Sequence, residues 1–306
     1  MSLLALFKKK GPNGFGYGST AEEVTGGISL SGKTILITGC NSGLGKESMR
    51  VLALRGAKIL GAARTLEKAN AACREAGGAA SKGYACELSD PSSVRACVES
   101  IKKDKIKLDV IICNAGIMAL PALEKAHGYE LQFLTNHIGH FILVTGLLNF
   151  LTEEGRVVML SSSAHMMAPK GGILFDNLDG SKWYKPWPFY GQSKFANLLF
   201  AKELSYRFKG TKKTAFAVHP GVIQTNLGRH MNSFARFVFG LTEPLFLKSI
   251  PQGAATECYV ASSPTISSLS GNYFADCNVA SPRKDSEDKE LSKKLWDVSE
   301  KIVSGI

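Results

Sequence analysis

Tyr190 and Lys194 lie four positions apart in a segment of good helix formers, whose apolar face continues through Leu198 and Leu199. Residues four apart share one face of a helix, so the phenol and the ammonium are expected side by side. A neighbouring ammonium favours the phenolate and lowers the pKa of a tyrosine from its usual value of about 10. Tyr190 could then act as a general acid or base. Because this spacing also occurs by chance on many helices, the pair needs support from the rest of the chain.

A glycine-rich turn gives the first support. Residues 38–45 read TGCNSGLG, follow an apolar run typical of a strand, and precede an amphipathic helical pattern. Glycines in such a turn let the backbone approach a pyrophosphate, whose charge is stabilised at the helix N-terminus. A lone glycine cluster is weak evidence, but its place between a strand and a helix predicts a dinucleotide site.

The end of the second expected strand distinguishes between the two dinucleotides. An acidic residue there would bind the adenosine ribose of NAD, whereas an arginine would accept the 2′-phosphate of NADP. This chain has Arg64 and Thr65 at that point, and the first acidic residue after the strand is Glu67. The sequence therefore favours NADP, with Arg64 as the phosphate partner and Thr65 as a helper. The alternative is that Arg64 only begins a surface helix.

Other polar residues follow expected strands. Asn114, Ala115 and Gly116 end the fourth strand, residues 161–163 (SSS) end the fifth, and residues 219–222 (HPGV) end the sixth. The carboxyl ends of parallel strands form the edge at which open α/β sheets bind ligands. The sequence has no Gly-x-Ser-x-Gly motif, which excludes the serine-hydrolase elbow.

Asn136 lies inside a long helical pattern between His137 and His140. Histidines three positions apart can bind a metal ion, but no suitable third ligand accompanies them. The sequence therefore predicts no metal site and favours a helix–helix contact for the two histidines.

The positions of these motifs require a sheet with helical connections. From residue 33 onward, apolar strand-like runs alternate with amphipathic helical segments, which predicts a single α/β domain of the Rossmann type, with a doubly wound parallel sheet and helices on both faces. We expect a lead-in arm at residues 1–32, in which Thr20 has capping-box spacing, and one domain at residues 33–306. The expected strands are 34–38, 58–63, 83–86, 108–113, 156–161 and 214–219, and the expected helices are 44–55, 66–75, 91–102, 130–151 and 190–208.

Two segments interrupt this alternation. Residues 164–189 form an additional polar and aromatic connection, and residues 226–250 contain an apolar stretch. The second segment fits an apolar lid over a lipophilic substrate or a membrane-contacting surface, and it equally fits a helix packed on the domain.

Composition limits the partners and the compartment. The chain has 306 residues, a net charge of +11 and seven dispersed cysteines. The positive net charge favours an anionic partner such as a phosphorylated cofactor or an acidic membrane surface. Nucleic acid is the least favoured partner, because the sequence lacks a basic stripe interleaved with aromatic residues. An odd number of scattered cysteines indicates free thiols in a reducing intracellular compartment. Residues 1–10 place a short apolar run before three lysines, which could contact a membrane surface peripherally or form a frayed arm.

Taken together, these motifs resemble those of the short-chain dehydrogenase/reductase family. The glycine turn, Asn114-Ala115-Gly116, Asn136, the serine after strand five, the Tyr190/Lys194 pair and Pro220-Gly221 occur in the family's order over residues 33–225. Residues 41–46 (NSGLGK), 135–141 (TNHIGHF), 175–178 (FDNL) and 219–221 (HPG) are similar to the subgroup of retinol dehydrogenases, the WW-domain oxidoreductase and Tic32-like proteins.

The resemblance implies roles for four residues. Tyr190 would be the proton donor, and Lys194 would lower its pKa and hold the nicotinamide ribose. Ser162 would orient the substrate, with Ser161 and Ser163 as weaker matches, and Asn136 would anchor a water molecule in a proton relay. The residues that the glycine turn, strand ends and resemblance assign to the cofactor are Gly39, Asn41, Ser42, Gly43, Leu44, Gly45, Arg64, Thr65, Glu87, Leu88, Asn114, Ala115, Gly116, Tyr190, Lys194, Pro220, Gly221, Val222 and Thr225.

Two features depart from the family pattern. Glu87 occupies the place of the usual aspartate beside adenine, and the gap from Ser162 to Tyr190 is longer than in compact members, as in the retinol-dehydrogenase-like subgroup. The expected function is NADP(H)-dependent interconversion of a carbonyl and an alcohol on a lipophilic substrate such as a retinoid, steroid or fatty aldehyde. The alternative is a membrane-associated NADP(H)-binding redox sensor or scaffold. The resemblance also implies a homo-oligomer, although an additional apolar terminal segment could leave a monomer. The cysteines and residues 1–10 favour a cytosolic or peripheral membrane location.

Overall fold

A central eight-stranded sheet organises the chain in the computed structural model, which describes residues 8–223 and 247–306. The strand order is β10-β9-β8-β7-β4-β1-β2-β3, and all neighbours pair in parallel except β10 with β9. A separate pair, β5 and β6, forms a short hairpin. The strands are β1 Thr34–Thr38, β2 Lys58–Ala63, β3 Lys82–Ala85, β4 Leu108–Cys113, β5 Lys125–Ala126, β6 Tyr129–Glu130, β7 Leu151–Leu160, β8 Thr214–His219, β9 Tyr273–Ala275 and β10 Asn278–Val279.

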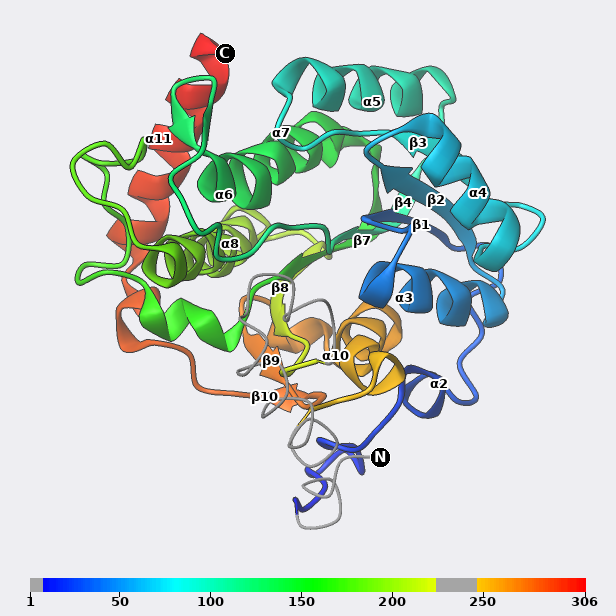
Figure 1. The fold of residues 1–306 in the computed structure, drawn as a ribbon. Coiled ribbons are helices and arrows are strands. Elements are labelled where there is room, and N and C mark those ends of the chain that lie inside the picture. Colours follow the sequence, from blue (N-terminus) through cyan, green and yellow to red (C-terminus); the bar gives the residue numbers. More distant parts are fainter. Residues whose placement is uncertain (1–7, 224–246) are drawn as a thin grey trace, which may run out of the picture.

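Helices cover both faces of this sheet, as Figure 1 shows. One face carries α5, α7 and α8, with α11 packed on α8, and the other carries α3, α4 and α10, with α2 beside α10. The larger helices are α3 Gly43–Leu54, α4 Leu66–Ala76, α5 Pro91–Lys103, α7 Gly139–Leu147, α8 Pro186–Arg207, α10 Ile250–Ser262 and α11 Lys289–Gly305, and the short ones are α2 Ala21–Val24 and α6 Leu131–Phe133. This is the predicted Rossmann-type fold.

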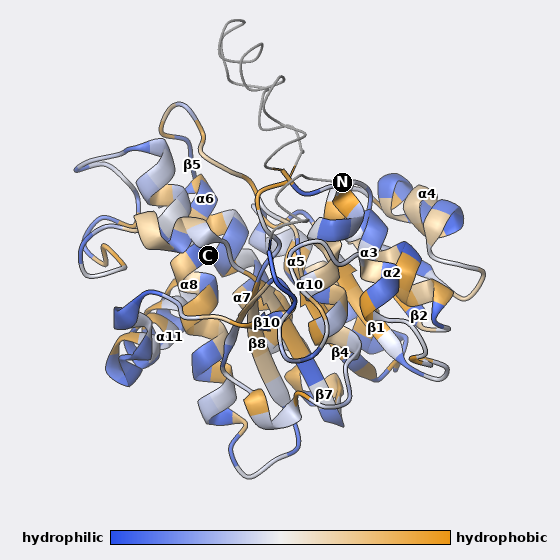
Figure 2. Ribbon diagram, turned by 90° about the horizontal axis from the view of Figure 1, so that it is seen from below, coloured by the Kyte–Doolittle hydropathy of each residue, from blue (hydrophilic) through white to orange (hydrophobic). Residues whose placement is uncertain are grey.

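The sheet separates two apolar cores because its strands are buried on both faces. Ile35 and Ile37 of β1 point to one core, and Leu36 points to the other. Such continuous apolar strands are expected where helices cover a parallel sheet on both sides. Figure 2 shows the apolar colouring concentrated on the strands and on the inner helix faces.

Most of the predicted elements are confirmed, with ends shifted by a few residues. The main correction concerns the predicted helix over residues 130–151. It consists of α6, a π-helical turn at Leu134–Ile138, α7 and a 3-10 turn at Leu148–Phe150, after which β7 already begins at Leu151. The uniform apolar pattern predicted a helix but could not indicate the wider turn inside it.

The N-terminal arm packs against the C-terminal quarter of the chain. Thr20 and Glu23 form the predicted capping box at the start of α2. Phe15 packs edge-on against Tyr259 of α10 at a ring distance of 5.8 Å, and Gln252 donates to the carbonyl oxygen of Gly18. The described part of the arm is therefore a fixed element of the domain.

Several predictions fall on residues whose structure is not described. These are residues 1–7, Thr225, and residues 226–246 of the expected lid. The end of that segment is corrected, because Ile250 begins α10, whose central residues are fully buried. The described chain also contains α11, β9 and β10, which the sequence did not predict.

One stretch, Leu131–Phe150, is long and apolar enough to cross a membrane by composition alone. However, 78% of its most apolar window is buried within the domain. Its side chains pack between α5, α8 and the sheet, so its apolar character is explained by the core.

Candidate active site

A cavity of about 490 Å³ opens at the carboxyl ends of β4, β7 and β8. Each of these strands ends in a polar segment, so the parallel arrangement brings distant parts of the chain together. Three of the four predicted catalytic residues line it. The lining comprises Leu44, Asn114, Gly116, Ile117, Met118, Leu160, Ser161, Ser162, Ser163, Ala164, Met167, Trp187, Tyr190, Lys194, His219, Pro220, Gly221, Val222 and Ile223.

Tyr190 and Ser162 face each other in this cavity. The Ser162 hydroxyl lies close enough to the phenol to act on its pKa, although Tyr190 comes from α8 and Ser162 follows β7. Ser162 Oγ accepts a bond from the backbone N–H of Ala164 at 3.1 Å, which fixes its rotamer at the start of a 3-10 turn. Burial raises the pKa of Tyr190 to about 12, and the Ser162 hydroxyl only partly opposes this rise.

The predicted lowering of the Tyr190 pKa is therefore not seen in this arrangement. The Nζ of Lys194 lies 5.8 Å from the centre of the Tyr190 ring and donates to the carbonyl oxygen of Leu160 at 3.0 Å. Lys194 is itself buried, which lowers its pKa to about 8. Burial of the phenol outweighs the attraction of an ammonium held at that distance.

Asn136 lies in the π-helical turn immediately behind the cavity. Its Oδ1 accepts from the backbone N–H of Ile117 at 2.8 Å, and its Nδ2 donates to the Ile117 carbonyl and to Ser193 Oγ, both at 2.9 Å. A Cβ on Gly116 would lie 2.9 Å from Asn136 Oδ1 and 3.3 Å from Lys194 Nζ. Asn136 thus connects the β4 loop to α8 close to Lys194.

The glycine turn is built for close backbone approach. A Cβ on Gly45 would lie 2.4 Å from the carbonyl oxygen of Gly39 and 2.5 Å from Asn114 Nδ2, so α3 must begin directly against this turn. Gly43 has a φ of +54°, and no atom lies within 4 Å of the position of a Cβ there. Asn114 Nδ2 donates to the Thr38 carbonyl at 2.8 Å, which joins the ends of β1 and β4. The first turn of α3 receives no side-chain cap, so its N–H groups suit a phosphate.

Arg64 and Thr65 follow β2 at the same edge. Arg64 is exposed, and within the described residues its guanidinium has no ion pair or hydrogen bond. Thr65 caps α4: its hydroxyl oxygen accepts a hydrogen bond from the N–H of Lys68 at 3.4 Å. The arginine is therefore available to a ligand, whereas the threonine is partly engaged.

The residues predicted beside adenine lie after β3. Leu88 is buried, and its carbonyl closely approaches Gly139 of α7. The Glu87 carboxylate accepts from the backbone N–H and the hydroxyl of Ser89 at 3.2 and 2.9 Å. Glu87 is thus held at the sheet edge by a local turn.

His137 and His140 do not form a metal site, and no cluster of three or more candidate ligands occurs in the described chain. His137 Nε2 contacts Ser299 Oγ of α11 at 2.8 Å, and His140 Nε2 contacts Thr38 Oγ1 at 2.9 Å. The predicted helix–helix contact is confirmed for His137, whereas His140 contacts the end of strand β1.

The remaining predicted residues divide between the cavity wall and the surrounding turns. Pro220, Gly221 and Val222 line the cavity, Ala115 donates its N–H to Thr38 Oγ1, and Asn41 and Ser42 are exposed beside the glycine turn. Thr225 lies outside the described residues. The sequence did not predict the apolar wall residues Ile117, Met118, Met167 and Trp187. The aromatic insertion before Tyr190 was a signal for the last of these.

Comparison with known proteins agrees with this geometry. The family model for short chain dehydrogenase matches residues 33–235. The chloroplastic short-chain dehydrogenase TIC 32 A of Brassica napus is 40% identical over 97% of both chains, and human retinol dehydrogenase 11 is 39% identical over 90% of this chain and 87% of its own. A crystal structure of an uncharacterised protein from Mycobacterium paratuberculosis is 33% identical, with a TM-score of 0.76 over 94% of this chain and 98% of that chain. The chain therefore belongs to the short-chain dehydrogenase family, whose members are oxidoreductases that act on alcohol or carbonyl groups with a nicotinamide cofactor.

Proposed function

We propose that this chain is an NADP(H)-dependent oxidoreductase that interconverts a carbonyl and an alcohol on a lipophilic substrate, with Tyr190 as the general acid/base. The observation that carries this proposal is the meeting of Tyr190, Ser162 and Lys194 in one cavity. The three residues come from two elements, and each has a polar group in reach of a small reacting centre.

The residues around the cavity fit a dinucleotide. The open backbone at Gly43 and the uncapped start of α3 suit a pyrophosphate, and the bidentate guanidinium of Arg64 suits a 2′-phosphate at the end of β2. The cavity itself, at the ends of β4 and β7, suits the nicotinamide end. When bound, the nicotinamide supplies or receives the hydride.

The rim of the cavity supports a lipophilic substrate. Met167, Trp187 and Val222 line the cavity and are nonetheless 45%, 45% and 49% exposed. Three large apolar side chains around one opening form a surface that an aliphatic or polyene chain would cover. The Trp187 ring lies edge-on to Tyr190 at 6.1 Å, which places this apolar rim next to the proton donor.

Four side chains take part in the proposed chemistry. In reduction, Tyr190 gives its phenolic proton to the carbonyl oxygen, and Ser162 Oγ orients that oxygen through a hydrogen bond. Lys194 supplies positive charge that stabilises the phenolate left behind and favours its reprotonation. Asn136 holds the Ile117 backbone and the start of α8 in register, so the donor and the cavity wall keep their spacing.

Replacement of Tyr190 by phenylalanine tests the proposal, because it removes only the hydroxyl. We expect turnover of NADPH with retinoid, steroid, fatty aldehyde or quinone substrates to fall about 10²–10⁴-fold. Tyr206→Phe on the same helix is the matched control and should retain activity. If Tyr190→Phe keeps the biological role of the protein without turnover, the sensor or scaffold alternative is the better account.

A further inference from the structure

Two histidines hold the peptide unit that follows Ser162. Its carbonyl oxygen, on Ser162, accepts from His165 Nδ1 at 2.5 Å and from the backbone N–H of His165 at 3.0 Å. Its N–H, on Ser163, donates to His219 Nδ1 at 3.1 Å. Both polar groups of one peptide are therefore bonded to imidazole rings from different parts of the chain.

The contacts determine which nitrogen of each ring carries hydrogen. His165 Nδ1 faces a carbonyl and must donate, whereas its Nε2 accepts the backbone N–H of Arg283 at 3.1 Å. His219 Nδ1 faces an N–H and must accept, so the hydrogen of a neutral His219 is on Nε2. The two rings are therefore neutral and have opposite tautomers.

We propose that His165 and His219 are positioning residues that hold the Ser162–Ser163 peptide from both sides and so direct the Ser162 hydroxyl toward Tyr190. This inference rests on the proposed function for the role of Ser162, but the tautomers themselves do not depend on it. Ser162 has extended backbone with a φ of −167°, and it begins the 3-10 turn Ser163–Met167. A rotation of the peptide behind it would turn Oγ away from the reacting centre.

The surroundings of the two rings keep them neutral. His165 is 2% exposed and packs edge-on against Tyr273 at 5.0 Å, with Arg283 and Asp285 as its charged neighbours. Burial is the largest effect and lowers its pKa; the Arg283 charge acts in the same direction, whereas the bond to the Ser162 carbonyl and the Asp285 charge oppose it.

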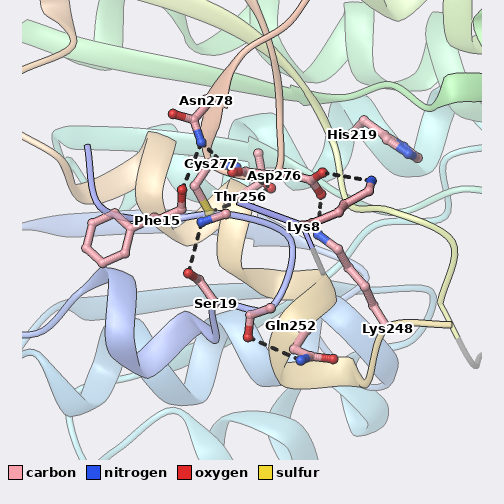
Figure 3. A network of polar contacts seen from close by, with 12 residues as sticks. Lys8, Phe15, Ser19, His219, Lys248, Gln252, Thr256, Asp276, Cys277 and Asn278 are labelled. Atoms are coloured by element: carbon pink, nitrogen blue, oxygen red, sulfur yellow. Dashed lines mark hydrogen bonds and ion pairs between the residues drawn. The ribbon is translucent and has the colours of Figure 1, made fainter. Parts of the chain in front are cut away.

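His219 lies beside an ion pair between the buried Lys248 and the partly exposed Asp276. Figure 3 shows Asp276 between the ammonium groups of Lys8 and Lys248, with His219 on the adjacent strand. Lys248 Nζ lies 2.7 Å from Asp276 Oδ1, and Lys8 Nζ lies 3.6 Å from Oδ2. Burial, and then the Lys248 charge, lower the pKa of His219 to about 4, with His165 and Lys8 acting in the same direction and Asp276 opposing them. Protonation would place a second N–H against the N–H of Ser163 and break the contact.

The first test reads the tautomers directly. Long-range ¹H–¹⁵N correlation spectra of the ¹⁵N-histidine-labelled full chain at pH 7.5 should show Nδ1–H for His165 and Nε2–H for His219. The spectra of His165→Asn and His219→Asn assign the signals. The same tautomer for both rings, or a charged ring, would overturn the proposal whatever the enzyme's substrate.

The second test compares variants that differ in one acceptor. In His219→Asn, the amide oxygen takes the place of Nδ1, whereas His219→Leu keeps bulk without an acceptor. We expect His219→Leu to lower kcat by at least about tenfold, with the KM for NADPH changed less than about twofold, and His219→Asn to recover most of kcat. The reductase assay uses the aldehyde or ketone that the wild-type chain reduces fastest.

Matched variants distinguish positioning from general destabilisation. For His165, the asparagine side chain keeps a donor in place of Nδ1 and should outperform His165→Leu. His127→Asn, in the exposed β5–β6 turn, should match wild type. Equal kcat for the Leu and Asn variants of both histidines, or a loss confined to KM, would refute the positioning role. If a leucine variant does not fold, the spectra and the asparagine variants still decide.

Discussion

Lys194 on α8 donates a hydrogen bond of 3.0 Å to the carbonyl oxygen of Leu160, the last residue of β7. The same carbonyl accepts Asn197 Nδ2 at 3.1 Å, so one strand end holds two side chains of the helix that carries Tyr190. This relationship places the ammonium at the wall of the cavity, where we propose that it acts on both the phenol and a bound ribose. It also explains why a charged group is retained at a site where only 3% of its surface is exposed.

Replacing Lys194 by methionine should therefore affect both binding and chemistry. We expect the KM for NADPH to rise and kcat to fall, with a combined loss in kcat/KM of at least about a hundredfold, because the charged donor is lost. Steady-state kinetics provide the measurement. Lys202→Met on the same helix removes a lysine that pairs with Glu287 and should leave both constants near wild type. Similar losses in the two variants would contradict the role of Lys194.

Arg64 should set the preference between the two dinucleotides. Charged hydrogen bonds contribute about 1.5–3 kcal/mol, so Arg64→Ser should raise the KM for NADPH roughly tenfold to a hundredfold and leave the KM for NADH nearly unchanged. Parallel titrations with both cofactors measure this. A wild-type preference for NADH would refute the assignment of Arg64.

Gly45→Ala tests the contact between α3 and the glycine turn. The new Cβ would fall 2.4 Å from the Gly39 carbonyl oxygen, so the turn must move. We expect NADPH affinity to fall by at least about tenfold and the free energy of unfolding to fall by about 1–3 kcal/mol. Fluorescence titration and chemical denaturation measure the two effects. Gly305→Ala is the control, since no atom lies within 4 Å of its Cβ position.

His137 should make folding stability sensitive to mild acid. Burial lowers the pKa of His137 to about 3, far below its unfolded value of about 6.5. At pH values between these two pKa values, the unfolded chain binds one more proton than the folded chain. The free energy of unfolding therefore increases with pH over this range and decreases as the pH falls below 6.5. Between pH 6 and 5, His137→Phe should reduce the slope of the free energy of unfolding against pH by up to about 1.4 kcal/mol per pH unit. Urea denaturation of both proteins at each pH provides the comparison, because the other titrating groups cancel. Parallel curves would contradict the buried neutral ring.

The sequence predicted most of the strands and the reactive pair, because both depend on local patterns. Strand ends carry Asn114, Ser162 and His219, and parallel pairing alone is enough to bring them together. The sequence could not predict the π-helical turn at Asn136, because the same apolar pattern is compatible with an α-helical turn and with a wider π-helical turn.

The histidine contacts lay beyond local prediction for another reason. His165 reaches Arg283, which lies 118 positions away, and Ser163 reaches His219, which lies 56 positions away. Such contacts depend on how β9 and the following loop close over the site, and α10, β9 and α11 were themselves not predicted. The raised pKa of Tyr190 was missed similarly, since spacing on a helix does not reveal burial.

The packing of the N-terminal arm on α10 and the β9–β10 turn has a consequence for biosynthesis. The arm is translated before the rest of the domain, yet Asn13 donates to the carbonyl oxygen of Cys277, a residue 264 positions later. The arm cannot make this contact until residue 277 has been translated. Its docking is a late event in folding, since long-range contacts form only after the intervening chain is ordered. A nascent chain stalled before residue 250 should therefore leave the arm open to proteases, although most of the sheet has already been synthesised.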